Sequence, residues 1–236
     1  MGIGVGDAAE RLGVGHHRVR TLIGTGHLAA ERVSGVYIID ANSLDALAQL
    51  QRPAHVRAFS RRIAWACAAL VDGDIPGWVT GSELSRLRSR LDNLPADAGS
   101  WAARLRSRAI HTWVLRGGSG QLRSLLANKN VARTGISATN LIGEAQMTAD
   151  QAEIWVADSA AIRVLRADFG LLPSESGNVT IRVADVPELR GLGTGDGNAF
   201  RLIVAADLIN GRDARARYAG GELLAATLAE RRWRTR

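Results

Sequence analysis

The chain has few of the residues on which metal sites and disulfides depend. Cys67 is the only cysteine among 236 residues, so an internal disulfide and a cysteine-rich zinc site are both excluded. The adjacent His16 and His17 would point about 100° apart on a helix rather than toward one metal ion. We therefore expect no metal and no other cofactor, and we interpret Cys67 as a residue of the hydrophobic core.

Long apolar runs are also missing. No stretch approaches the roughly 18 consecutive apolar residues of a membrane-spanning helix, and no secretory signal pattern is visible. The sequence therefore predicts a cytoplasmic protein with no membrane partner. Lysine is nearly absent too, since Lys129 is the only lysine among 30 basic residues. This arginine bias indicates a high-GC bacterial or phage genome.

Signatures of catalysis are weak. The glycine-rich segments 117–120 and 191–197 miss the spacings of a phosphate loop, a nucleophile elbow and a dinucleotide-binding turn. His111 is the only histidine after residue 55, and we expect it on a strand. We therefore predict that the protein has no catalytic residues and is not an enzyme.

The chain is basic and long enough for two domains. Its net charge is +7 and 46% of its residues are hydrophobic. The excess charge is spread out, with eight arginines against five acids in residues 1–62 and 22 basic residues against 18 acids in residues 63–236. Such a balance suits a polyanionic partner without proving that one binds.

The first 50 residues have the pattern of two short helices followed by a β-hairpin. We expect helices over 6–14 and 15–23, a glycine-containing turn between them, and a hairpin over 33–39 around Gly35. Apolar residues are spaced to close one small core, formed by Ala8, Ala9, Leu12, Val14, Val19, Leu22 and Ile23. This order is typical of a winged helix-turn-helix, whose second helix enters the DNA major groove.

The polar residues of the second helix and the hairpin are the candidate DNA contacts. With Val19 buried, the helical period turns three side chains away from the core and leaves two more at the edge of that face. In the hairpin, three polar residues surround Gly35 and could approach a backbone or minor groove. The candidate set is His16, His17, Arg18, Arg20, Thr21, Arg32, Ser34 and Tyr37. The alternative is that these are ordinary surface residues.

Residues 51–108 are expected to form a basic linker and a helical connector. Arg57, Arg61 and Arg62 either contact flanking phosphates or belong to a solvated hinge. Ser60 is the expected cap of a helix that runs to about residue 71. The capping-box pattern 80–83 predicts the start of a helix that runs to about residue 91, and a third helix is expected over 100–108. We interpret the helices of 59–108 as a spacer or a dimer interface.

From residue 109 the pattern changes to strands that alternate with helices. We expect strands over 110–115, 131–135, 153–157 and 178–183, and helices over 119–127, 137–143, 160–169, 199–210 and 213–229. The fold class is therefore α+β (mixed α/β). The expected domains are 1–50, a winged helix-turn-helix; 51–108, the connector; and 109–236, an α/β effector domain.

Residues 6–50 resemble the excisionase-type and MerR-type winged helix-turn-helix. The matching residues are Ala8-Ala9, Leu12-Gly13-Val14, Val19, Leu22-Ile23, Leu28 and a closing helix over 40–47 that Asp40 or Asn42 would cap. The resemblance implies a DNA-binding fold. It leaves the biological role open, because the family includes repressors, activators, excisionases and antitoxins.

The C-terminal region resembles AbiEi-type antitoxins of type IV toxin–antitoxin systems, through loose motifs in segments 134–143, 153–157, 169–183 and 206–224. This resemblance implies an antitoxin that represses its own promoter and is functionally linked to a nucleotidyltransferase toxin. The chain lacks the Gly-Ser…Asp-x-Asp/Glu signature of the toxin itself.

We therefore expect a sequence-specific transcriptional regulator whose partner is double-stranded DNA. One winged unit buries little surface, so we also expect a homodimer on half-sites about 34 Å apart. Two alternatives are an excisionase-like architectural factor that bends DNA and a regulator that senses a small ligand through its C-terminal domain.

Overall fold

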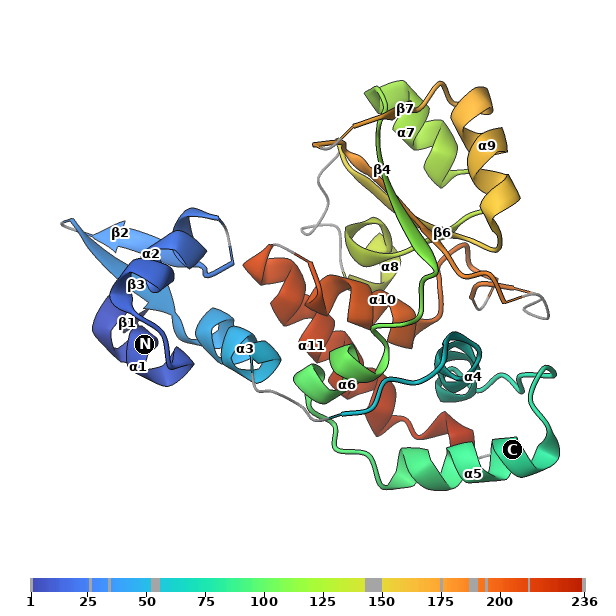
Figure 1. Cartoon of the computed structure of the whole chain (residues 1–236), viewed down its shortest axis with the longest axis horizontal. Coiled ribbons are helices and arrows are strands. Elements are labelled where there is room, and N and C mark those ends of the chain that lie inside the picture. The colour runs from blue at the N-terminus through green and yellow to red at the C-terminus, as the bar shows by residue number, and fades with distance from the viewer. Residues whose placement is uncertain are drawn as a thin grey trace.

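The computed structural model describes residues 2–25, 27–33, 35–51, 56–142, 150–174, 176–186, 191–193, 195–211 and 213–234. Within these residues the chain is a mixed α+β protein with two β-sheets, which confirms the fold class at that level. Figure 1 shows the N-terminal unit, in blue, to one side of a larger body formed by the rest of the chain.

The N-terminal unit packs three helices against a small antiparallel sheet. Its elements are β1 (Gly2–Ile3), α1 (Val5–Leu12), α2 (His16–Gly24), β2 (Ala30–Val33), β3 (Val36–Asp40) and α3 (Ala41–Gln51). Strand β3 lies between β1 and β2. Gly13 joins α1 to α2 with a φ of 63°, a left-handed conformation that glycine adopts without strain. The glycine thus allows the short turn between the two helices.

One small core holds this unit together, as the apolar spacing predicts. Val19 and Ile39 are fully buried. The other buried members are Ala8, Ala9, Leu22, Leu28, Leu44 and Leu47, with Leu12, Val14 and Ile23 packed at the margin. At the start of α3, the backbone N–H of Ser43 donates to the Asp40 carboxylate over 2.7 Å, so Asp40 is the cap.

Three helices follow in the chain, α4 (Arg61–Val71), α5 (Gly81–Asp92) and α6 (Ala98–Arg104). Helix α5 begins with the predicted capping box. The Glu83 backbone N–H donates to Thr80 Oγ1 over 3.3 Å, and the Thr80 N–H donates to the Glu83 carboxylate over 2.9 Å. Helix α6 begins earlier than predicted because Asp97 caps it by accepting from the Ser100 N–H. It also ends earlier, at Arg104.

The larger sheet has five strands in the order β5-β6-β8-β4-β7. The strands are β4 (His111–Arg116), β5 (Ala132–Arg133), β6 (Ala152–Val156), β7 (Leu172–Pro173) and β8 (Val179–Val183). Strands β6 and β8 run parallel, and the other neighbouring pairs are antiparallel.

Helices cover both faces of this sheet. Helices α7 (Ser119–Leu126) and α9 (Ser159–Asp168) share one core with Ile154 and Ile181 of the central strands. On the other face, Trp155 shares a core with α10 (Arg201–Ile209), which α11 (Ala214–Ala229) contacts closely. The remaining elements are short: η1 (Gly135–Ser137), α8 (Thr139–Ile142) and η3 (Arg232–Arg234).

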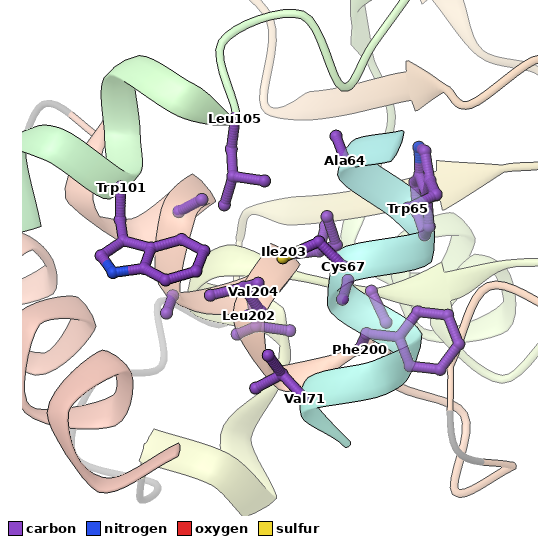
Figure 2. Packing of buried hydrophobic residues seen from close by; sticks show 14 of the residues in the cluster. Ala64, Trp65, Cys67, Val71, Trp101, Leu105, Phe200, Leu202, Ile203 and Val204 are labelled. Atoms are coloured by element: carbon purple, nitrogen blue, oxygen red, sulfur yellow. The ribbon is translucent and has the colours of Figure 1, made fainter. Parts of the chain in front are cut away.

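The largest core joins α4 and α6 to α10 and the sheet. Trp65 of α4 meets Trp155 edge to face, with ring centroids 5.0 Å apart. Figure 2 shows side chains of α4, α6 and α10 in this core, among them Trp65, Trp101 and Phe200. Cys67 is fully buried here, which confirms the interpretation of this residue.

The helices expected as a spacer therefore belong to the main body. Residues 64–71 of α4 are all buried. So continuous an apolar run needs neighbours on every side, and α10 and the sheet provide them. The boundary placed between residues 108 and 109 thus runs through a shared core. None of the helices among the described residues is long and apolar enough to cross a membrane.

Candidate nucleic-acid interface

Helix α2 presents one buried and one polar face. Val19 and Leu22 point into the core of the N-terminal unit. All five candidate contacts of this helix are exposed: His16, His17, Arg18, Arg20 and Thr21. None of the charged candidates forms an ion pair with another described residue. The Thr21 hydroxyl donates to the His17 carbonyl over 3.1 Å, so one polar group of this face is satisfied within the helix.

The hairpin adds two candidates on the side of the sheet that faces the helices. Arg32 lies directly opposite Tyr37 across β2 and β3, and its guanidinium carbon is 5.7 Å from the Tyr37 ring centre. Tyr37 shares a sheet face with the buried Ile39, because alternate residues of a strand point the same way. Ser34 lies outside the described residues.

The opposite face of the hairpin exposes three apolar residues. Val33, Val36 and Ile38 lie on it, with exposed fractions of 49%, 58% and 38%. Gly35 follows Ser34 with a φ of 86°, which a glycine adopts without strain. Glu31 pairs with Ile38 and is exposed on this same face, so the face carries one carboxylate beside the three apolar side chains.

The connector arginines differ in what they contact. Arg57 is exposed. Arg61 forms an ion pair with Asp185 over 3.3 Å, and Arg62 forms one with Glu83 over 2.9 Å and also donates to the Trp78 carbonyl. Both pairs link α4 to other parts of the main body. Of these three arginines, Arg57 alone forms no ion pair among the described residues.

A hydrogen bond and helix contacts connect the N-terminal unit to the body near the end of α2. Arg217 of α11 is buried and donates to the carbonyl oxygens of His27, in the segment after α2, and of Gly211. Helix α3 contacts both α6 and α11. Figure 1 shows α3 reaching toward these two helices.

A buried charge cluster lies on the α10 side of the large sheet, and the sequence patterns did not indicate it. Asp207 of α10 is 1% exposed. One carboxylate oxygen accepts from Arg108 Nε over 3.0 Å, and the other accepts from Thr134 Oγ1 and Trp155 Nε1 over 2.6 and 2.7 Å. Arg182 lies 3.5 Å away and pairs with Glu153.

This cluster is organised as a structural ion network. Burial opposes ionisation of Asp207, but the charges of Arg182 and Arg108 outweigh it and lower the pKa of Asp207. Burial also raises the pKa of Glu153, which Arg182 partly offsets. Because donors occupy both oxygens of Asp207, its carboxylate is engaged within the protein. Among the described residues, no group of three or more His, Cys, Asp or Glu could hold a metal ion.

No protein-family model, curated protein or solved structure matches this chain.

Proposed function

We propose that the protein is a sequence-specific DNA-binding regulator and that residues 2–51 act as its winged helix-turn-helix. The observation that carries the proposal is the exposed polar face of α2. It combines His17, Arg20 and Thr21 on a helix whose other face is held in a core by Val19. Arginine pairs well with guanine or phosphate, and histidine and threonine donate to base edges.

The hairpin supports the same proposal. Arg32 and Tyr37 lie on the sheet face that the helices also cover, where they would contact the backbone beside the groove that α2 enters. Both hairpin residues would contribute affinity rather than base selection. The interface of one unit is small, so we further propose that two copies bind half-sites about 34 Å apart.

The antitoxin role is the finer part of the proposal and derives from the resemblance of the C-terminal region. Under it, the protein represses its own promoter and counteracts a nucleotidyltransferase toxin encoded nearby. Co-expression tests this part. Growth inhibition by the neighbouring gene product, relieved by this chain, would support it, and inhibition that the chain does not relieve would contradict it.

DNA binding is tested by fluorescence anisotropy on DNA from upstream of the gene, with a scrambled duplex as competitor. We expect wild type to prefer the upstream DNA, and the His17→Ala, Arg20→Ala double variant to lose that preference. Arg163→Ala is the control, because Arg163 is an exposed arginine of α9. Equal, weak binding of wild type to both duplexes would contradict the proposal.

A further inference from the structure

Two arginines of the main body converge on one aromatic ring. Phe59 is buried, and the guanidinium carbons of Arg90 and Arg104 lie 5.6 and 5.9 Å from its ring centre. Arg90 comes from the end of α5 and Arg104 from the end of α6. Two positive charges therefore lie within cation–π range of the same ring.

Arg90 and Arg104 belong to the arginines of the body that form no ion pair with a described acid. Ion pairs to acids of the body are formed by Arg61, Arg62, Arg108, Arg182, Arg201 and Arg234. Among the described residues, no acid pairs with Arg90 or Arg104. Asp97 attracts Arg104 from a distance, but its carboxylate caps α6. The positive charge at Phe59 thus remains uncompensated.

The side chain of Arg104 is also incompletely hydrogen-bonded. Its Nε is buried without a hydrogen-bond partner in the structure. Burial lowers the pKa of Arg104, and the charge of Arg90 lowers it further. An anion beside the two guanidinium groups would offset the repulsion between them. Phosphate fits best, because a guanidinium offers paired donors that match phosphate oxygens.

The site is joined to the segment that leaves the N-terminal unit. The Phe59 N–H donates to the Arg104 carbonyl over 2.9 Å, and α3 contacts α6. Arg57, exposed and two residues before Phe59, adds a third positive charge to this segment. The site thus adjoins the segment that connects the N-terminal unit to the body.

We propose that Arg90 and Arg104, held on Phe59, form a second phosphate-binding site that takes the backbone of bound duplex DNA outside the segment read by α2. This inference rests on the proposed function for the identity of the polyanion. The site adds affinity that depends on salt and does not depend on base sequence.

The test measures how DNA affinity falls with salt for wild type and for Arg90→Gln, Arg104→Gln. Each phosphate contact contributes roughly 0.9 to the slope of log affinity against log salt, so we expect the slope to decrease in magnitude by about 2. Preference for the upstream DNA should be retained. The charge-preserving variant Arg90→Lys, Arg104→Lys should keep most of the slope, because lysine still neutralises a phosphate.

The matched control is Arg123→Gln, Arg163→Gln, which removes the same charge from exposed positions of α7 and α9. It should leave the slope close to that of wild type. If both glutamine pairs lower the slope equally, net charge alone is responsible and the inference is overturned. Thermal melts show whether each variant folds, and the single variant Arg90→Gln, at an exposed residue, keeps the test valid if Arg104→Gln unfolds.

The two proposals fail in different ways. If wild type prefers the upstream DNA while the Arg90, Arg104 variant has an unchanged slope, this inference fails and the proposed function stands. If wild type binds all duplexes alike but the variant still loses slope, the recognition role of α2 fails and the phosphate site stands. If wild type binds no duplex at all, both fail.

Discussion

The arginines of this chain divide by what surrounds them. Arg108 and Arg182 form ion pairs with the buried Asp207. Arg20 and Arg32 are exposed and have no acidic partner among the described residues. The buried arginines favour one particular packing of α10 against the sheet, because a buried charge without an opposite charge beside it costs free energy. The exposed arginines remain available to a ligand.

Replacing Asp207 by asparagine should destabilise the fold by about 3–5 kcal/mol, because Arg108 and Arg182 would keep their charges with no carboxylate beside them. Urea unfolding followed by circular dichroism measures the change. Asp168→Asn, at an exposed position at the end of α9, is the control and should cost far less. Similar losses in both variants would contradict the importance of the buried network.

Glu83 predicts a pH dependence of stability. Its hydrogen bonds to Arg62 and to the Thr80 backbone lower the pKa of Glu83 from 4.5 to about 2. A pKa that is depressed in the folded state contributes stability above the unfolded value and loses it as pH falls through the folded value. The melting-temperature difference between wild type and Glu83→Gln should therefore be constant above pH 5 and shrink toward pH 2. A difference that does not change with pH would contradict this assignment.

Local patterns predicted most helices of this chain closely, whereas the buried network was out of reach. The helix expected over 160–169 is observed over 159–168, and the capping box at Thr80 is present. Both depend on residues close together in the chain. The partners of Asp207 lie 99, 73 and 52 residues away at Arg108, Thr134 and Trp155, so no local pattern indicates them.

The order of the strands shows the same limit. Strand β4 precedes β6 in the chain, yet β8 lies between them in the sheet. Strand β7 has only two residues and exists because it pairs with the end of β4. Long-range pairing determines both features, and the alternation of apolar residues along one strand contains no information about its neighbours. The exposure of the candidate residues on α2 was predictable, because the helical period alone turns them away from the core.

Two adjacent glycines of α11 provide a matched test of how α10 and α11 pack. A Cβ on Gly220 would lie 2.7 Å from the Leu208 Cβ and 2.9 Å from the Ala205 carbonyl oxygen, whereas a Cβ on Gly221 would meet nothing within 4 Å. We expect Gly220→Ala to destabilise by about 1–3 kcal/mol through overpacking. Gly221→Ala should stabilise by about 0.5–1 kcal/mol, since alanine favours a helix.

Chemical denaturation of both variants measures these changes under the same conditions. Opposite signs would support the close contact between the two helices. Destabilisation by both alanines to the same extent would contradict it.

In the whole molecule, the proposed DNA-binding unit and the body are connected rather than independent. Arg217 and α3 join the two, and the core of the body takes in helices from both sides of residue 108. The segment that follows α2 is therefore in direct contact with α11 of the body.

Two copies on one operator should produce a complex with twice the protein mass of a single chain. Light scattering of the purified protein and of its complex with upstream DNA measures this directly. We expect two chains per duplex, because one unit covers only one half-site. A single chain per duplex at saturation would contradict the dimeric arrangement and leave recognition by α2 intact.

The central claim is that α2 reads base sequence. Selection of binding sites from a random duplex pool, performed with wild type and with Arg20→Ala, tests it most directly. We predict that wild type enriches a defined motif and that the variant loses preference at one position of that motif while retaining the others, because each side chain reads its own base pair. Enrichment of no motif by wild type, or of an identical motif by both proteins, would contradict the account.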